Sequence, residues 1–289
     1  MAALTRVRSL LFMPGTKADM IAKIPRFAPD VAAVDLEDAV AVADKETARA
    51  TAAQAIDALG TGGPTTVLVR VNPVGSPWFT ADVAAAARCA AVGLVVPKLS
   101  SPQDLHELRQ ALAENSWTDA LVVAGIETAL GVADARALLV GGLAGAYFGA
   151  EDYIADIGGR RTSAGAEVLY ARSQVCLAAY LAGVPAIDQA VVGLGDDDFY
   201  RSDAEDGRSL GYQGKICIHP RQLELAHQVF TPTPEEVAHA EAVLAAGDEG
   251  VAVVDGQMVD AVHVKMARSV LARAGRTASR AQAPEPERR

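Results

Sequence analysis

Eight short apolar runs recur along the first 220 residues, and turn residues and a segment with helical spacing follow each of them. The runs are apolar at consecutive rather than alternate positions, which is typical of strands buried on both faces of a parallel sheet. They are Arg8–Gly15, Val31–Asp38, Thr65–Asn72, Gly93–Lys98, Ala120–Thr128, Gly145–Asp152, Pro185–Val192 and Lys215–Pro220. Eight strands that alternate with helices predict an α/β fold, a closed (β/α)8 TIM barrel, for which about 250 residues is typical.

The segments between the runs carry helix signals of their own. In Ser101–Glu114, for example, Ser101 is a suitable N-cap and Pro102 takes the first helical position. An open doubly wound sheet is the structural alternative. Neither a GxGxxG after the first strand nor a GxxxxGK[ST] loop occurs in the sequence, which argues against that fold.

The chain beyond the last predicted strand indicates a C-terminal helical appendage, which is not needed to close a barrel. Pro234 begins a predicted helix that ends near Ala246. An extended piece then turns at Asp255-Gly256, and another helix is predicted from about Ala261.

The predicted organisation has three parts. Residues 1–230 form the catalytic (β/α)8 barrel, and residues 231–278 form a C-terminal helical or lid segment. Residues 279–289 are polar and contain prolines, so we expect a disordered tail.

Composition excludes several classes of protein. The formal net charge of -10 argues against nucleic acid as a partner, because nucleic-acid binding needs a basic surface. Cys89, Cys176 and Cys217 form no CxxC pair and are interpreted as core thiols of a reducing compartment. The apolar run near the N-terminus is too short for a signal peptide, and no stretch reaches membrane-spanning length. We therefore expect a cytoplasmic protein without a membrane partner.

Polar side chains stand where the predicted strands end. The working face of a (β/α)8 barrel lies at the carboxyl ends of its strands, so we expect these side chains to surround one cavity. In chain order they are Lys17, Asp35, Glu37, Asp38, Arg70, Asn72, Lys98, Glu127, Glu151, Asp152 and His219.

Glu127 and Asp152, at the ends of neighbouring predicted strands, are candidate ligands for Mg²⁺. This cation takes oxygen ligands and is often held by one or two carboxylates, with water and substrate in the other positions. Those positions would bind the carboxylate and the adjacent oxygen of a small acid. Arg70 is then placed to grip or polarise the same oxygens.

Purely structural interpretations stay open from the spacing alone. Asp152 would cap the helix that follows it, and Arg70 would form an ion pair at the rim. Asp35–Asp38 would form an ion-paired network beneath the site. His219 would be a packed structural histidine, and Gly158–Arg161 would be a solvated loop.

A set of motifs extends in order over nearly the whole chain: RSLLFMPG, VDLEDAV with a following K and AR, VRVN, VPK, IET, FGAEDY, GKICIHPRQ and GQMVD. In this set the chain resembles the citrate lyase β-subunit-like proteins of the HpcH/HpaI aldolase superfamily. It is also similar to malyl-CoA and citramalyl-CoA lyases. The resemblance implies a (β/α)8 barrel, a Mg²⁺ ion, a coenzyme A thioester substrate and Claisen-type making or breaking of a carbon–carbon bond.

The resemblance also implies roles for single residues of the barrel. Glu127 of IET and Asp152 of GAED match the metal ligands, and Arg70 of RVN matches the substrate arginine. Glu127 is also expected to contact the substrate.

The positions that contact coenzyme A in the family match Phe12, Lys17 and Lys23. Position 17 is often arginine in relatives. Lysine keeps the charge but loses the bidentate fork.

The acidic residue of the MVD motif matches Asp260, which we expect to perform acid/base work. In relatives this segment can close over the site of a neighbouring subunit, and we expect a homotrimer or homohexamer. The expected reaction is a Mg-dependent, reversible cleavage of a 3-hydroxyacyl-CoA of the malyl-, citramalyl- or citryl-CoA type. Its products are an acyl-CoA and a keto acid.

Three alternatives remain. The first is a malate synthase-like or thioesterase activity on the same scaffold. The second is the β subunit of a citrate lyase complex, which acts on an acyl-carrier protein. The third is an inactive barrel used for binding, and the intact set of Glu127, Asp152 and Arg70 argues against it.

Overall fold

A computed structural model of the 289-residue chain describes residues 4–247 and 250–276. The chain divides into two compact units, Met1–Phe230 and Thr231–Arg289. The segment 279–289, predicted to be disordered, lies outside the described residues.

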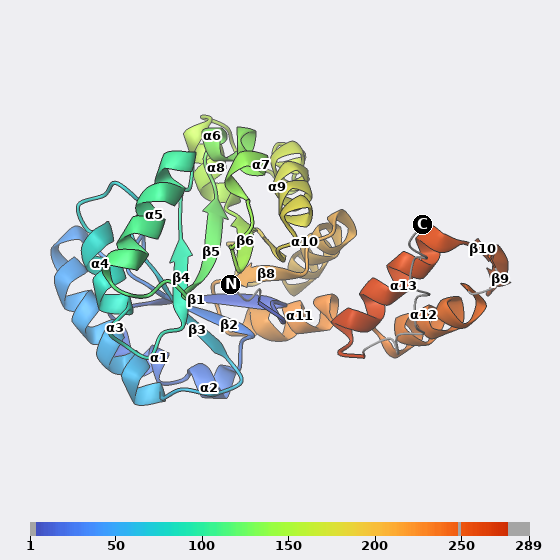
Figure 1. Cartoon of the computed structure of the whole chain (residues 1–289), viewed down its shortest axis with the longest axis horizontal. Helices are drawn as coiled ribbons and strands as arrows, with labels where there is room; N and C mark the ends of the chain where they lie inside the picture. Colours follow the sequence, from blue (N-terminus) through green and yellow to red (C-terminus); the bar gives the residue numbers. More distant parts are fainter. Residues whose placement is uncertain (1–3, 248–249, 277–289) are drawn as a thin grey trace, which may run out of the picture. The chain divides into compact units, whose positions relative to one another are not determined.

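The first unit is a closed barrel of eight parallel strands in sequence order, with β8 paired to β1 (Figure 1). The strands are β1 (Ser9–Pro14), β2 (Val31–Asp35), β3 (Thr66–Arg70), β4 (Gly93–Val96), β5 (Leu121–Ile126), β6 (Gly145–Phe148), β7 (Ala186–Asp188) and β8 (Gly214–Cys217). The register pairs Pro14 with Asp35 and Asp35 with Arg70, so the first three strands end at one level. The predicted (β/α)8 barrel is confirmed.

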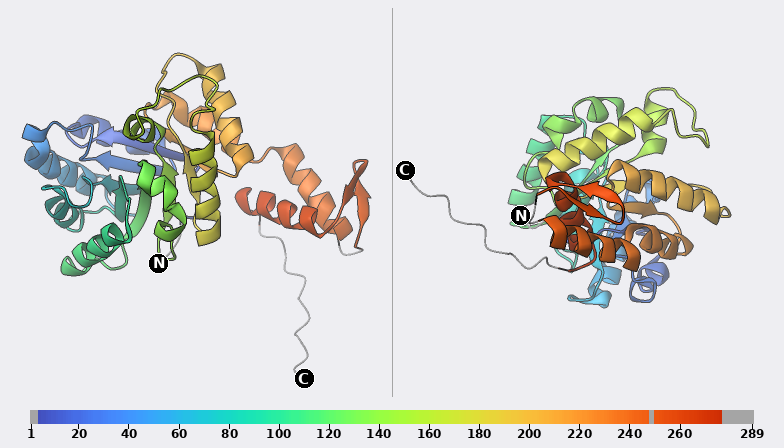
Figure 2. Two further views of the ribbon diagram at one scale, coloured as in Figure 1. Left: turned by 90° about the horizontal axis from the view of Figure 1, so that it is seen from above. Right: turned by 90° about the vertical axis from the view of Figure 1, so that its right-hand side faces the viewer.

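Helices cover the outside of this barrel in both further views (Figure 2). They are α1 (Ala18–Ile21), α2 (Ile24–Phe27), the short 3-10 helix η1 (Val42–Asp44), α3 (Lys45–Leu59), α4 (Phe79–Ala86), α5 (Pro102–Glu114), α6 (Ala129–Ala133), α7 (Ala135–Leu138), α8 (Ala150–Asp156), α9 (Leu169–Ala182), α10 (Asp197–Leu210) and α11 (Arg221–Phe230). The predicted cap of α5 is present, because Ser101 Oγ accepts a hydrogen bond from the backbone N–H of Asp104.

The strands are buried on both faces, which explains their continuous apolar runs. Successive strand residues point to opposite faces. Leu10 therefore belongs to the cluster inside the barrel, whereas Leu11 packs in the cluster between strands and helices. Both side chains are fully buried, and burial of each contributes about 1.5–3 kcal/mol.

Each strand ends before the end of its predicted run. The clearest correction concerns Gly145–Asp152, because β6 stops at Phe148 and α8 begins at Ala150. Asp152 therefore lies in the first turn of a helix rather than at the end of a strand. The polar residues of the runs occupy the turns after the strands, where their side chains can meet one another at the rim.

The second unit contains α12 (Pro234–Ala246), β9 (Ala252–Val254), β10 (Gln257–Val259) and α13 (Ala261–Arg273). Both helices and the turn agree with the sequence predictions. The two strands are antiparallel, and the turn residues Asp255 and Gly256 have φ values of 50° and 76°. Positive φ at both central residues is the requirement of a type I′ hairpin turn, which Asp-Gly meets well.

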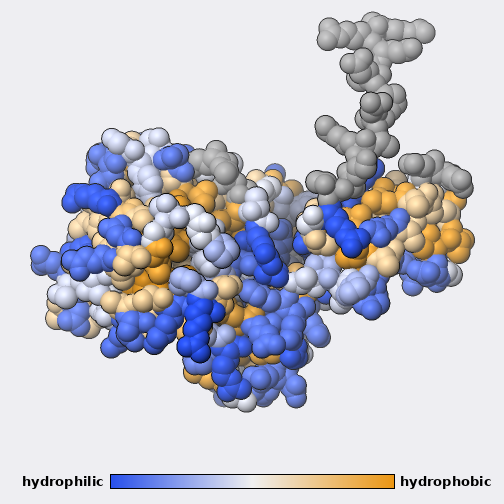
Figure 3. Space-filling view, turned by 90° about the horizontal axis from the view of Figure 1, so that it is seen from below, coloured by the Kyte–Doolittle hydropathy of each residue, from blue (hydrophilic) through white to orange (hydrophobic). Residues whose placement is uncertain are grey.

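The second unit also exposes several large apolar side chains. Val253 on β9, Met258 on β10, and Val262 and Met266 on α13 are all more than half exposed. Hydrophobic areas on this unit are visible in the space-filling view (Figure 3).

The remaining compositional predictions can be compared with the described part of the chain. No helix within it is both long and apolar enough to cross a membrane. Cys176 and Cys217 are buried free thiols, as predicted, whereas Cys89 is only half-buried.

Candidate functional site

The carboxyl ends of β2 to β6 bring together most of the polar residues that the sequence places at the rim. Asp35 ends β2, Arg70 ends β3, and Glu127 directly follows β5. Glu37 and Lys98 each lie two residues beyond their strand. The contacts among these side chains define the candidate site.

Arg70 is held on three sides. Its Nε and Nη2 donate to the two carboxylate oxygens of Asp35 at 2.7 and 2.5 Å, and its Nη1 lies 3.1 Å from Glu37 Oε2. The guanidinium also lies over the Phe12 ring, 4.5 Å from its centroid. Burial lowers the pKa of Arg70, but the hydrogen bonds and charge of Asp35 outweigh burial and raise it. Arg70 is therefore a permanent cation with a set orientation.

The turn after β2 is organised by buried groups, and its predicted ion-paired network is present. Asp35 accepts hydrogen bonds from the backbone N–H of Glu37 (2.8 Å) and of Ala39 (3.2 Å). Lys45, at the start of α3, donates to the carbonyls of Leu36 and Glu37, both at 2.7 Å. These contacts fix the backbone that carries Glu37.

Lys98 lies at the centre of the carboxylates. Its Nζ donates to Glu37 Oε1 at 2.7 Å and lies 3.2 Å from Asp152 Oδ1 and 3.6 Å from Asp38 Oδ2. Its backbone N–H donates to Glu127 Oε1 at 2.9 Å. The sequence placed Lys98 at the rim but gave it no role. The available signal was a lysine two residues beyond a strand, on the side of the barrel where carboxylates follow the neighbouring strands.

Glu127 is the most strongly perturbed carboxyl group of the site. Its side chain is buried, and burial is the largest effect that raises its pKa to about 8. The negative charges of Glu37 and Asp152 raise the pKa further, whereas Arg70 and Lys98 oppose the shift. Burial also raises the pKa of Glu37, to about 6. The positive charges of Arg70 and Lys98 are therefore too weak to offset the effect of burial and of the neighbouring carboxylates on the pKa of Glu127.

Asp152 lies inside the first turn of α8 and faces the site, where Lys98 Nζ is 3.2 Å from its Oδ1. The N-cap of α8 is Gly149, and within this fully described helix start no side chain supplies the cap. The alternative interpretation of Asp152 as a helix cap is therefore wrong. A Cβ atom at position 149 would lie 2.3 Å from Glu127 Oε2, so glycine is required for the close approach of helix and carboxylate.

The site carries an excess of negative charge. Four carboxylates face two cations, and we call these six residues the rim cluster: Asp35, Glu37, Glu127, Asp152, Arg70 and Lys98. No group of three or more histidine, cysteine or acidic side chains that could hold a metal ion occurs in residues 4–247 and 250–276. A cation at Glu127 and Asp152 would therefore need further ligands from water or substrate, as Mg²⁺ commonly has.

The other predicted site residues lie apart from these contacts or beneath them. Phe12 is half-buried below Arg70, and its ring meets Tyr147 edge-on at 6.1 Å. Lys17 and Lys23 are exposed, at the starts of α1 and α2, and Lys23 pairs with Asp19 at 3.4 Å.

Asp260 belongs to the second unit, where it caps α13. Its Oδ1 accepts from the backbone N–H of Val262 at 2.9 Å and lies 2.8 Å from Nδ1 of His263. The hydrogen bond with His263, followed by those from the backbone, lowers the pKa of Asp260. Its catalytic role remains a prediction.

His219 fits the structural interpretation. It is half-buried, and its Nδ1 accepts a hydrogen bond from the backbone N–H of Arg221 at 3.2 Å.

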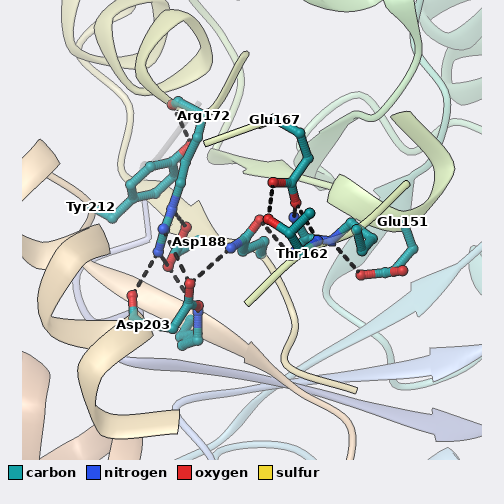
Figure 4. Close-up of polar contacts among 10 residues, drawn as sticks. Glu151, Thr162, Glu167, Arg172, Asp188, Asp203 and Tyr212 are labelled. Atoms are coloured by element: carbon teal, nitrogen blue, oxygen red, sulfur yellow. Dashed lines mark hydrogen bonds and ion pairs between the residues drawn. The ribbon is translucent and has the colours of Figure 1, made fainter. Parts of the chain in front are cut away.

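A second charged cluster lies between the barrel wall and helices α9 and α10, and sequence reasoning missed it (Figure 4). Arg172 donates to both oxygens of Asp188 at 2.8 and 2.6 Å and to Asp203 Oδ1 at 3.2 Å. Lys215 Nζ reaches Asp188 at 2.8 Å and Asp203 at 2.5 Å. We call these four residues the outer cluster. They come from four different elements, so no local sequence pattern reveals them.

The loop before α9 is not merely solvated, which corrects the sequence interpretation of Gly158–Arg161. Arg161 donates to Glu151 at 2.9 Å and to Glu167 at 2.7 Å. Glu167 also accepts from Thr162 Oγ1 at 2.6 Å, as Figure 4 shows. Through a longer contact of 3.4 Å with Gln189, Arg161 connects this loop to the outer cluster.

Comparison with known proteins gives consistent similarities. Residues 8–220 match the family described as HpcH/HpaI aldolase/citrate lyase. The chain is 46% identical over 275 residues to the citrate lyase subunit beta-like protein of Deinococcus radiodurans, covering 92% of this chain and 96% of that protein. It is 34% identical over 274 residues to the (3S)-malyl-CoA thioesterase of Cereibacter sphaeroides, covering 92% and 94%.

Among solved structures, the chain is similar to CitE from Mycobacterium tuberculosis in complex with magnesium, acetoacetate and coenzyme A. The TM-score is 0.77 at 31% sequence identity, and the match covers 92% of this chain and 97% of that one.

Proposed function

The chain belongs to the HpcH/HpaI aldolase/citrate lyase family, and on this premise we propose that it is a Mg²⁺-dependent carbon–carbon lyase. Its substrate would be a 3-hydroxyacyl-CoA of the malyl-, citramalyl- or citryl-CoA type, cleaved reversibly to an acyl-CoA and a keto acid. The observation that carries the proposal is the unbalanced charge of the rim cluster beside a fixed guanidinium. The magnesium, acetoacetate and coenzyme A in the complex of the similar structure support it.

Glu127 and Asp152 fit a divalent cation. Both offer oxygen ligands, and the raised pKa of about 8 indicates that Glu127 is ionised easily only when positive charge is added beside it. Bound Mg²⁺ would supply Lewis-acid stabilisation of negative charge on substrate oxygens.

Arg70 would orient the substrate and stabilise oxyanion charge as it develops. Asp35 takes two of its five N–H groups, and Glu37 lies within ion-pair distance of Nη1, which leaves donors for a substrate oxygen. Because Asp35 and Phe12 already fix the guanidinium, little reorganisation is needed during the reaction.

Coenzyme A would be held on the same side of the barrel. Lys17 lies in the turn after β1, and Lys23 is exposed at the start of α2. Their ammonium groups could pair with phosphates, although neither offers the bidentate fork of arginine. Phe12 contributes by supporting Arg70 from below.

Proton transfer is assigned to Asp260 in this proposal. In the cleavage direction a base removes the hydroxyl proton, the carbonyl of the keto acid forms, and the carbon–carbon bond breaks. The electron pair of that bond stays on the acyl-CoA fragment as a thioester enolate, which takes a proton that Asp260 has received from solvent, while the base returns the hydroxyl proton to solvent. Asp260 would act in its own subunit or in a neighbour's within a homotrimer or homohexamer.

Asp260→Asn separates this role from helix capping, because asparagine and aspartate are N-caps of similar quality. We expect kcat to fall by about 10²–10⁴-fold while the melting temperature changes little. Near-normal turnover with Mg²⁺ binding retained would remove Asp260 from the mechanism.

A thioesterase is the second candidate function, and the similarity to a (3S)-malyl-CoA thioesterase favours it. Hydrolysis would release free coenzyme A and a hydroxy acid without a keto acid. A citrate lyase β subunit, which would need an acyl-carrier protein, is a third possibility supported by the similarity to a citrate lyase subunit beta-like protein.

One experiment distinguishes these functions. The purified chain is incubated with acetyl-CoA or propionyl-CoA and a panel of keto acids, with Mg²⁺ or with EDTA, and the products are identified by mass spectrometry. A metal-dependent hydroxyacyl-CoA supports the lyase, and a free hydroxy acid formed from a pair indicates a synthase. A parallel incubation with malyl-CoA alone identifies a thioesterase, because it releases free malate and coenzyme A without a keto acid. No product from any pair or from malyl-CoA, with folded protein that binds Mg²⁺, would argue against activity on free CoA esters and favour a carrier-protein substrate.

A further inference from the structure

Lys98 has an unusual backbone for a residue with a side chain. Its φ of 54° places it in the left-handed region, which costs free energy for residues other than glycine. This turn points the backbone N–H at Glu127 Oε1, at 2.9 Å, and sends the side chain toward Glu37. The strained turn therefore positions two groups of Lys98, its backbone N–H and its ammonium, against carboxylates of the rim cluster.

Lys98 thereby touches both proposed metal ligands. Its backbone holds Glu127, and its ammonium lies 3.2 Å from Asp152 Oδ1. The same ammonium is anchored more closely by Glu37 Oε1, at 2.7 Å. A cation attached to the protein thus occupies part of the space between the carboxylates.

An ammonium group and a divalent cation at the same carboxylate repel each other strongly at distances of a few ångströms. A Mg²⁺ ion on Asp152 therefore requires the contact between Lys98 and Asp152 to open. The side chain can make this change, because it is 27% exposed and has a flexible four-carbon stem. Glu37, which is 4% exposed, can keep its contact with the ammonium meanwhile.

We propose that Lys98 is an internal counter-cation of the metal site, which neutralises Asp152 and Glu37 in the metal-free protein and gives up Asp152 when Mg²⁺ binds. This inference rests on the proposed function, in that Glu127 and Asp152 are taken as the metal ligands. Its consequence is a metal site that stays assembled without metal and binds Mg²⁺ more weakly than its carboxylates alone would.

Isothermal titration of the full chain with MgCl2 tests the proposal. The titration is made in the same buffer and at the same pH for every variant. Lys98→Met should bind Mg²⁺ at least about tenfold more tightly than the wild type, which corresponds to about 1.4 kcal/mol. Lys98→Arg keeps the charge and should stay close to the wild type.

Two further variants serve as controls. Arg109→Met removes the same charge from an exposed position on α5 and should leave the Kd for Mg²⁺ unchanged. Lys98→Gln retains a hydrogen-bond donor for Glu37 without the charge. It should reproduce the tighter binding if Lys98→Met fails to fold.

Thermal unfolding with and without Mg²⁺ gives a second measurement. Metal-free Lys98→Met should melt at a lower temperature than the wild type, because two carboxylates lose their cation. Saturating Mg²⁺ should then raise its melting temperature by more than it raises that of the wild type, since tighter binding stabilises more.

The outcomes separate this inference from the proposed function. Equal Kd values and equal melting shifts would mean that Lys98 is only structural, and would overturn the inference while Mg²⁺ binding itself is retained. Absence of Mg²⁺ binding in every variant and in the wild type would overturn both the inference and the assignment of Glu127 and Asp152 as ligands.

Discussion

The rim cluster and the outer cluster both gather charged side chains in the barrel unit, but they differ in charge balance. The outer cluster pairs two cations with two carboxylates, and each carboxylate contacts both cations. The rim cluster has two cations for four carboxylates. The two clusters thus share residue types, but only the rim cluster has more carboxylates than cations.

The pKa values of their carboxyl groups reflect this difference. Burial raises the pKa of Asp203 in the outer cluster, but the charges of Lys215 and Arg172 outweigh burial and lower it. In the rim cluster, burial and like charges raise the pKa of Glu127 to about 8. A balanced buried cluster is complete by itself, whereas an unbalanced one is prepared for a ligand of positive charge.

The largest effect is expected when the balance of the outer cluster is broken. Lys215→Met leaves Asp188 and Asp203 with one cation in a buried setting. The free energy of unfolding should fall by about 3–5 kcal/mol, because an uncompensated buried charge remains. Urea denaturation measures this change.

Lys23→Met is the matched control, because the ion pair of Lys23 with Asp19 is exposed. It should cost less than about 1 kcal/mol. A similar loss of unfolding free energy in both variants would show that neither burial nor the charge balance of the outer cluster determines that loss.

The next effect concerns catalysis at the rim. Arg70→Lys keeps the charge but loses the paired N–H groups that contact Asp35. We expect kcat/KM for the CoA thioester substrate to fall by about 10²–10³-fold, because the donor proposed to stabilise the oxyanion would be misplaced. Arg109→Lys, on the exposed side of α5, serves as the control. Unchanged kcat/KM in Arg70→Lys would mean that only the positive charge of Arg70 matters, and not the geometry of its N–H groups.

A smaller effect should appear as a pH dependence of the metal-free protein. In the unfolded chain Glu127 ionises near its ordinary pKa of 4.5, whereas the folded protein holds its proton up to about pH 8. The folded state binds more protons between these values, so this contribution to stability is present below pH 4.5 and is lost as pH rises to 8.

Glu127→Gln removes this contribution. The difference in unfolding free energy between the wild type and Glu127→Gln should change by about 2 kcal/mol between pH 6 and 8. Chemical denaturation at several pH values with EDTA measures it. If the unfolding free energies of the wild type and Glu127→Gln depend on pH in the same way, the pKa of Glu127 is not raised in the folded protein.

The smallest effect is expected at Arg161, which joins the loop before α9 to the outer cluster. Its side chain is 25% exposed, and its partners Glu151 and Glu167 are exposed to 46% and 18%. Arg161→Met should lower the unfolding free energy by about 1 kcal/mol, since partly exposed charged pairs contribute modestly. Protease cleavage within the loop should become faster. A loss of unfolding free energy as large as that of Lys215→Met would mean that Arg161 stabilises the protein as much as a buried member of the outer cluster does.

Much of the fold was predictable because its cause is local and repeated. The continuous apolar runs require strands covered on both faces, and helix signals such as Ser101-Pro102 lie between them. Much of the rim was predictable for a related reason: parallel strands of one barrel all end on the same side, so Glu127 and Arg70 had to face one region. The hairpin turn at Asp255-Gly256 likewise depends on adjacent residues only.

The position of Asp152 shows where this reasoning stops. The run GAYFGAED continues apolar character up to its carboxylates, and the break at Gly149 depends on the approach of Glu127 from another strand. Contact between segments that are distant in the sequence decides the break, so the pattern along the chain does not show it.

The sequence by itself determined the barrel, the turn chemistry and the identity of the residues that reach the rim. Only the tertiary structure decided which charges are neutralised. It placed Lys98 among carboxylates from other strands and assembled the outer cluster from four elements. The physical reason is that the apolar pattern and the turn preferences are carried by neighbouring residues in the chain, whereas the energy of a charge depends on every group brought within a few ångströms of it.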